Sequence, residues 1–179
     1  MEKYKTISSE IIFENKWWQY IKDQYILPTG QISDYHYVHT HGSTFIIPKK
    51  NHNTFYMIRQ YRYLNQKFSI EFPGGGCIKG LSKIENAKKE LKEEVGLEAK
   101  NLLKIGYFNP YHGVTDEICE VYLATELTFL QQEPDDSEEI EVLELNKKQI
   151  IDLIKKGEIW DGMTLSSWCI YNYYELKSR

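Results

Sequence analysis

Hydrophobic and polar positions alternate over much of the first half of the chain. Short runs rich in Ile, Val, Phe, Tyr and Trp are separated by turn residues such as Pro28-Thr29-Gly30. This pattern is typical of β-strands. The expected strands cover residues 7–14, 17–27, 33–39, 43–48, 54–61 and 69–72.

The run from Phe55 to Tyr61 shows the alternation most clearly. Successive side chains of a strand point to opposite faces of its sheet. Phe55, Met57 and Arg59 should therefore share one face with Tyr61, while the residues between them take the other.

The pattern changes after residue 72. Residues 72–80 (FPGGGCIKG) hold four glycines and a proline, which indicates a turn with unusual backbone angles. Residues 82–95 then carry apolar side chains at helical spacing. Ser82 and Glu85 form a capping box, and Gly96 can end the helix.

Strands and helices are mixed in the remainder of the chain. Asn146 is a candidate N-cap and Gly157 a candidate end for a helix over 146–156. The other expected elements are strands at about 99–109, 117–127 and 140–145, an acidic loop at 131–139 and a final helix at about 163–177. The class is therefore α+β. We expect a small N-terminal β subdomain over residues 1–42, followed by a main domain over residues 43–179.

Composition excludes several classes of function. The net charge is −4, and no stripe of Lys and Arg is present, so nucleic-acid binding is not expected. Three widely spaced cysteines argue against a disulfide framework. The sequence shows neither a secretory leader nor an apolar run long enough for a membrane span, which favours a cytoplasmic protein.

The helix over 82–95 carries the candidate chemistry. Glu90 and Glu94 stand one turn apart on one face, and Glu93 lies beside them. Like charges at this spacing repel unless a cation lies between them, and Mg²⁺ prefers carboxylate oxygens. The alternative is a solvated Lys/Glu face, which the helix alone favours. The glycines 74–76 shift the balance, because a turn of this kind suits phosphate or metal.

Residues 75–97 resemble the Nudix box, G-x5-E-x7-R-E-U-x-E-E-x-G-U, where U is apolar. The matching residues are Gly75, Glu90, Leu91, Glu93, Glu94, Gly96 and Leu97. Two positions differ, with Leu81 in place of Glu and Lys89 in place of Arg. In the family these two residues pair and support the helix, so that support is altered here.

Three further segments are similar to the ADP-ribose pyrophosphatase branch of the Nudix family. Residues 57–75 (MIRQYRY…IEFPGG) correspond to its R-Q-Y-R strand and E-L-P-A-G segment. Residues 106–127 correspond to its S-P-G-x-S-D-E segment and the strand after it. Residues 138–162 correspond to its closing strand and helix.

The resemblance implies roles for individual residues. Glu90, Glu94 and the carbonyl of Gly74 would bind metal, and Glu93 would share or support that role. A further metal-binding or base carboxylate is expected in the acidic loop, with Glu138 first and Asp136 and Glu139 as alternates. Arg59 and Arg62 would bind phosphate or the terminal ribose. Glu71 would orient substrate or a water molecule, and Asp116 and Glu117 would contact a sugar hydroxyl or cap a loop.

The resemblance implies a Nudix fold, an α/β/α sandwich with a mixed β-sheet. It also implies Mg²⁺-dependent hydrolysis, with Mn²⁺ as an alternative, of a nucleoside diphosphate linked to a sugar. ADP-ribose, giving AMP and ribose 5-phosphate, is the first choice; GDP-mannose or another nucleotide sugar is the second. A non-catalytic nucleotide-sugar-binding module is the third, motivated by Leu81 and Lys89. A homodimer, whose N-terminal subdomain contributes to the partner's adenine pocket, is also implied.

Overall fold

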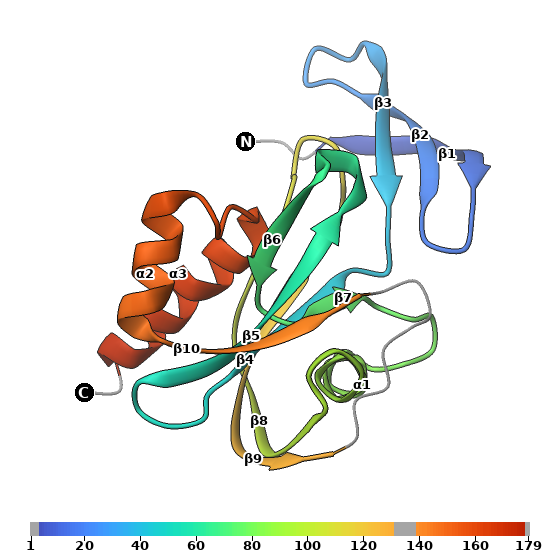
Figure 1. Ribbon diagram of the computed structural model, residues 1–179. Helices are drawn as coiled ribbons and strands as arrows, with labels where there is room; N and C mark the ends of the chain where they lie inside the picture. Colours follow the sequence, from blue (N-terminus) through green and yellow to red (C-terminus); the bar gives the residue numbers. More distant parts are fainter. Residues whose placement is uncertain (1–3, 131–138, 178–179) are drawn as a thin grey trace. The chain divides into compact units, whose positions relative to one another are not determined.

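The structure, a computed structural model, describes residues 4–130 and 139–177 (Figure 1). It divides into two compact units. The first is Met1–Gly42 with Asn109–Ile118, and the second is Ser43–Phe108 with Cys119–Arg179. Residues 109–118 belong to the first unit, whereas the sequence analysis placed them in the main domain. The reason is backbone pairing, since Val38 N–H donates to Val114 O at 2.8 Å.

The first unit is built on a three-stranded antiparallel sheet in the order β1-β2-β3. Its strands are β1 (Lys5–Glu14), β2 (Gln19–Ile26) and β3 (Ile32–His39). Gly30, with a φ of 83°, makes the turn between β2 and β3, as its sequence signal predicted. Every residue of β1 is exposed. Trp17 and Trp18 follow this strand, and at 67% and 38% exposure they are not core residues either.

The second unit contains two sheets, in the orders β10-β5-β6 and β7-β4-β9-β8. β4 and β9 run parallel, and all the other pairs are antiparallel. The four-stranded sheet is therefore mixed, and the three-stranded sheet is antiparallel. Its strands are β4 (Ser43–Pro48), β5 (Thr54–Arg62), β6 (Lys67–Glu71), β7 (Gly74–Gly76), β8 (Leu97–Phe108), β9 (Cys119–Phe129) and β10 (Glu141–Asn146). A 3₁₀ turn, η1 (Tyr63–Asn65), joins β5 to β6. All six residues of β4 are buried, which fits a central strand covered on both faces.

Three α-helices complete this unit: α1 (Lys83–Val95), α2 (Lys147–Lys156) and α3 (Gly162–Lys177). Both predicted capping signals are confirmed. Ser82 and Glu85 form the capping box of α1, and Gly96 ends it at a φ of 67°. Asn146 caps α2, and Gly157 ends it at a φ of 72°. No helix in the described part of the chain is both long and apolar enough to cross a membrane.

The helices lie on opposite sides of the sheets (Figure 1). Leu91 and Val95 of α1 pack in one hydrophobic cluster, which includes Tyr56 and Ile58 of β5. The other cluster holds Phe55 and Met57 of β5 together with side chains of α2 and α3. The alternation predicted for β5 therefore divides two cores. The α/β/α sandwich expected from the sequence is confirmed.

Candidate active site

The acidic helix is held against the glycine-rich segment. Gly74 N–H donates to Glu94 Oε2 at 2.7 Å, and Glu94 is only 4% exposed. A Cβ at Gly75 would lie 3.0 Å from the carboxyl carbon of Glu90. The carboxylates of Glu90 and Glu94 thus approach the backbone of two consecutive glycines.

The glycine-rich segment is not the free turn expected from its sequence. Gly74, Gly75 and Gly76 form the strand β7, which pairs with β4. A Cβ at Gly74 would lie 2.3 Å from the carbonyl oxygen of Thr44, which is far below a permitted contact. Glycine is therefore required for the close approach of β7 to β4, and β7 in turn positions the two carboxylates.

Lys89 lies beside the carboxylates of Glu90 and Glu93. Its Nζ donates to Glu93 Oε2, four residues further along α1, and lies 4.0 Å from Glu90 Oε1. Leu81, the other departure from the Nudix box, is 41% exposed. Lys89 therefore pairs with a carboxylate on its own helix, where the family pattern has a brace to residue 81.

Arg62 and Glu71 form a two-point ion pair on the α1 face of β5 and β6. Arg62 Nε donates to Glu71 Oε1 at 2.8 Å, and its Nη2 donates to Oε2. Gln60 Nε2 also donates to Glu71 Oε2, at 3.3 Å. Glu71 is 1% exposed, so this arrangement supplies the partners that a buried carboxylate requires.

The Arg62 pair lies within the electrostatic reach of α1. The hydrogen bonds to Glu71 raise the pKa of Arg62 against the opposing effect of burial, and the negative charges of Asp161 and Glu94 add to the rise. A permanent cation therefore lies near the carboxylates of α1. A phosphate close to Glu94 would meet this positive charge.

Arg59 lies on the opposite face of β5, so the structure does not bring the two predicted phosphate-binding arginines to one place. Its guanidinium carbon is 4.3 Å from the ring centroid of Phe68, and Nη1 donates to Glu141 Oε2 at 3.2 Å. Both partners lie on the side of β5 that carries α2 and α3.

Asp116 and Glu117 lie in the first unit. Asp116 Oδ2 is 2.6 Å from His39 Nδ1, and its Oδ1 accepts from Thr40 N–H at 3.3 Å. Glu117 N–H donates to Thr115 Oγ1 at 3.4 Å. Asp116 therefore ties its loop to the end of β3.

A hollow of about 370 Å³ lies beside Asp116 within the same unit. Tyr35, Tyr37, Asn109 and His112 line it. Asn109 Oδ1 is buried and has no hydrogen-bond partner among the residues that the structure describes. Asn109 and the two tyrosines were not among the predicted site residues.

The acidic loop at residues 131–139 was predicted to supply a further metal-binding or base carboxylate. Glu138 and its alternate Asp136 fall outside the described residues. Glu139, the second alternate, is exposed. The assignment of a further carboxylate to this loop stays a prediction.

Sequence reasoning missed Asn86, which joins three parts of the site. It is fully buried; its Nδ2 donates to Thr44 Oγ1 at 3.0 Å, and its Oδ1 accepts from Ile78 N–H at 3.3 Å. Its position one turn before Glu90 on the same helical stripe was the available signal. Cys77 lies in the same region, and burial raises the pKa of its thiol.

The donor set fits a hard divalent cation that is held partly by other ligands. Within residues 4–130 and 139–177, no three His, Cys, Asp or Glu side chains form a group that could hold a metal by themselves. Mg²⁺ does not need such a group, because it commonly takes one or two carboxylates, several waters and phosphate oxygens. The Glu90 carboxylate lies 3.0 Å from the position that a Cβ of residue 75 would take, which keeps an oxygen donor close to the backbone of β7.

Comparison with known proteins identifies the family to which the chain belongs. The family model described as NUDIX domain matches residues 39–163. The chain is 33% identical over 162 residues to ADP-ribose pyrophosphatase of Bacillus subtilis, covering 89% of this chain and 88% of that protein. It is 31% identical over 163 residues to a methanol dehydrogenase activator of Bacillus methanolicus, covering 90% and 88%. Among solved structures, an ADP compounds hydrolase matches with a TM-score of 0.85 and 18% identity, covering 99% of this chain and 97% of that one.

Proposed function

The chain belongs to the NUDIX domain family, and we propose that this hydrolase cleaves the pyrophosphate of a nucleoside diphosphate linked to a sugar, with ADP-ribose as its first substrate. Water adds to one phosphorus, and the bond from that phosphorus to the bridging oxygen breaks. ADP-ribose and water then give AMP, ribose 5-phosphate and a proton.

The observation that carries the proposal is the contact between α1 and β7. Burying a charged carboxylate such as that of Glu94 destabilises the fold unless hydrogen bonds or a cation compensate for the lost hydration. Gly74 N–H supplies one hydrogen bond at 2.7 Å, and Glu90 lies one helical turn away against Gly75. A solvated Lys/Glu face, the alternative left open by the sequence, would not bury Glu94.

Glu90, Glu94 and the carbonyl oxygen of Gly74 are the proposed ligands of Mg²⁺, or of Mn²⁺ in its place, and Glu93 supports them. When bound, the cation lowers the pKa of a coordinated water and offsets phosphate charge. A carboxylate of the acidic loop, Glu138 first, is the proposed further metal ligand or base.

Arg62 is the proposed phosphate contact. Glu71 holds Nε and Nη2 of the guanidinium, which leaves Nη1 at the outer edge of the fork. A fixed fork loses less entropy when it binds an anion than a freely rotating side chain does. Glu71 is thus a positioning residue, and Arg59, on the other face of β5, is not assigned to this site.

The preference for ADP-ribose is supported by the name of the Bacillus subtilis relative. Asp116, which lines the hollow in the first unit, and Glu117, the next residue along the chain, are the proposed contacts for sugar hydroxyls. GDP-mannose or another nucleotide sugar is the alternative substrate, since a shared fold does not decide the substrate.

Homodimer formation and a cytoplasmic location stay predictions. The dimer is supported by apolar side chains on the exposed strand β1, where Ile7, Ile11 and Phe13 are 49%, 53% and 54% exposed. Light scattering of the purified protein tests it, because a mass near twice that of the chain is expected.

The decisive experiment measures product release from ADP-ribose, GDP-mannose and a panel of other nucleotide sugars. We expect AMP and ribose 5-phosphate from ADP-ribose with Mg²⁺ or Mn²⁺, and no release with a chelator. Glu94→Gln keeps the shape of the side chain and should lower the rate about 100-fold or more. Glu98→Gln, at an exposed position of β8, is the matched control. A parent protein that binds a nucleotide sugar without any turnover would instead be a binding module.

A further inference from the structure

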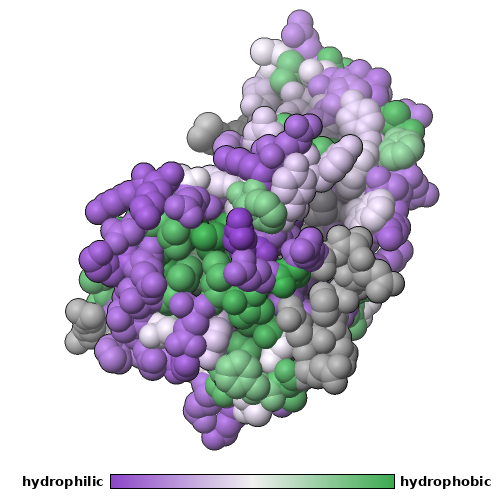
Figure 2. All heavy atoms as spheres, viewed as in Figure 1, coloured by the Kyte–Doolittle hydropathy of each residue, from purple (hydrophilic) through white to green (hydrophobic). Residues whose placement is uncertain are grey.

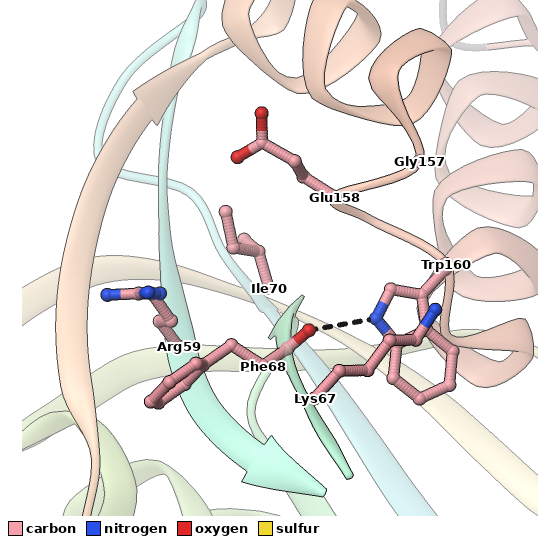
Figure 3. Close-up of a pocket in the computed structure, with 7 residues that line it drawn as sticks. All are labelled: Arg59, Lys67, Phe68, Ile70, Gly157, Glu158 and Trp160. Atoms are coloured by element: carbon pink, nitrogen blue, oxygen red, sulfur yellow. Dashed lines mark hydrogen bonds between the residues drawn. The ribbon is translucent and has the colours of Figure 1, made fainter. Parts of the chain in front are cut away.

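A second hollow, of about 250 Å³, lies on the side of the second unit away from α1 (Figure 3). Arg59 of β5, Phe68 and Ile70 of β6, and Trp160 from the segment between α2 and α3 are part of its lining. Lys67 and Glu158 also line it. In Figure 3 these side chains surround Ile70, with Arg59 on one side and Lys67 with Trp160 on the other.

The walls of this hollow are held in place by contacts of their own. Trp160 Nε1 donates to the backbone oxygen of Phe68 at 3.0 Å, which fixes the indole (Figure 3). Ile70 N–H donates to the backbone oxygen of Glu158 at 3.3 Å. Since Ile70 is 7% exposed, it forms an apolar floor. The hollow is therefore formed before any ligand arrives.

Two cations are held at the wall by aromatic rings. Lys67 Nζ lies 4.0 Å from the ring centroid of Trp160, and the Arg59 guanidinium carbon lies 4.3 Å from that of Phe68. Within the described ranges, Lys67 has no carboxylate partner, and Arg59 has one hydrogen bond, from Nη1 to the exposed Glu141. A cation on an aromatic ring is ordered but not neutralised, which suits an anionic ligand.

Glu158 brings one negative charge to the same hollow. It forms no ion pair with any residue that the structure describes, and in Figure 3 its carboxylate is directed away from Lys67. A carboxylate is an acceptor only, so a ligand beside it must supply donors such as hydroxyl groups. A simple anion would be repelled by Glu158, whereas an anion that also carries hydroxyl groups would satisfy both charges.

We propose that this hollow binds a small phosphorylated sugar. Its phosphate would be bound by Lys67, its hydroxyl groups would donate to Glu158, and its carbon skeleton would pack on Ile70 and Phe68, with the Arg59 cation on the opposite side of the hollow. Figure 2 shows that hydrophobic surface borders hydrophilic side chains on one face of the molecule. Phe68 and its ring neighbour Tyr61 are 52% and 51% exposed, so their rings are accessible to a ligand. The site goes beyond the proposed hydrolysis, since Arg59 and Ile70 lie on the face of β5 and β6 opposite to Arg62 and Glu71, and Lys67, which pairs with Arg62 across the strands, directs its Nζ to Trp160.

The test is calorimetric titration of the full chain with ribose 5-phosphate, with a chelator present so that binding to a metal-loaded active site does not contribute. Inorganic phosphate and ribose are titrated as partial ligands. We expect ribose 5-phosphate to bind about tenfold or more tightly than either one. Equal affinity for inorganic phosphate, or no binding of ribose 5-phosphate, would overturn the proposal.

Variants locate the binding. Lys67→Gln and Glu158→Gln should each weaken ribose 5-phosphate binding about tenfold and leave the rate of nucleotide-sugar hydrolysis unchanged. Lys79→Gln, which removes a lysine from the loop before α1, is the matched charge control. Binding that persists in Lys67→Gln and is lost in Glu94→Gln would place the ligand in the active site and contradict the proposal. Hydrolysis could fail in every assay without affecting these titrations.

Discussion

The backbone N–H of Gly74 donates to Oε2 of Glu94 at 2.7 Å, which joins a three-residue strand to the last turn of the acidic helix. The two residues are brought together because β7 pairs with the buried strand β4 and α1 packs over the same sheet. The acidic helix is therefore positioned by residues without side chains.

The three consecutive glycines of β7 should respond differently to alanine. Gly75→Ala places a Cβ 3.0 Å from the Glu90 carboxylate and should displace it, so the Mg²⁺ concentration for half-maximal rate should rise. Gly74→Ala meets the Thr44 carbonyl oxygen at 2.3 Å and should destabilise the fold by about 1–3 kcal/mol. Gly76→Ala meets nothing within 4 Å and is the control. Chemical denaturation and metal titration of activity separate the three, and equal effects at all positions would contradict this geometry.

Lys89 should weaken metal binding through its charge. Its Nζ donates to Glu93 and lies 4.0 Å from Glu90 Oε1, so it competes with a cation for the same carboxylates. Lys89→Gln should lower the Mg²⁺ concentration for half-maximal rate by roughly twofold to tenfold at low salt. Lys89→Arg keeps the charge and should behave like the parent. An increase in Mg²⁺ requirement for Lys89→Gln would show that Lys89 supports the site instead.

Arg62 and Glu71 should be strongly coupled in stability. Arg62→Met leaves the Glu71 carboxylate, which is 1% exposed, without its cation and should cost about 3–5 kcal/mol. Adding Glu71→Leu should recover much of that loss, because the buried charge is then removed. A double-mutant cycle by urea denaturation measures the coupling. Additive losses would mean that the pair contributes little to stability. In either case, the rate of nucleotide-sugar hydrolysis should stay low in both variants that lack Arg62.

Glu175 should make the fold sensitive to acid. The hydrogen bond from Lys49 Nζ, at 2.6 Å, holds the pKa of Glu175 below its ordinary value. A lowered carboxyl pKa stabilises the fold at pH values above the ordinary one, roughly 4.3, and this contribution is lost as pH falls through the lowered value. Glu175→Gln should therefore be less stable than the parent at pH 7, by on the order of 1 kcal/mol, and the difference should disappear as the pH falls through the lowered pKa of Glu175. Urea midpoints across pH 3–7 test this, with Glu98→Gln as the control; a pH-independent difference would exclude the ion pair as its cause.

The predicted helices and most strands depended on local signals, which explains why they are confirmed. The capping residues Ser82 and Asn146 and the ending residues Gly96 and Gly157 lie within or beside the helices that they delimit. The strand β7 had no such signal, because it exists only through pairing with β4, about thirty residues earlier. Glycine runs also predict turns, so the sequence pointed away from it.

The site was predictable as a motif but not as a geometry. Spacing placed Glu90 and Glu94 on one helical face, yet the hydrogen bond from Gly74 and the role of Asn86 depend on contacts between distant segments. Alternation along β5 already implied that Arg59 and Arg62 point to opposite faces. Both were nevertheless predicted to bind phosphate or ribose, because they share a charge. The ion pair between Arg62 and Glu71 could not be predicted, since it depends on the register of β5 with β6.

The division of two cores by β5 limits how the length of this strand can change. Phe55 and Met57 fill one core while Tyr56 and Ile58 fill the other, and Arg62 follows four residues later. Inserting or deleting one residue between Ile58 and Arg62 would turn Arg62 toward the face of Arg59 and leave Glu71 without its cation. This strand can accept substitutions, but it cannot accept the insertion or deletion of one residue. Natural variation in chain length should therefore collect elsewhere, in the turn that joins β5 to β6.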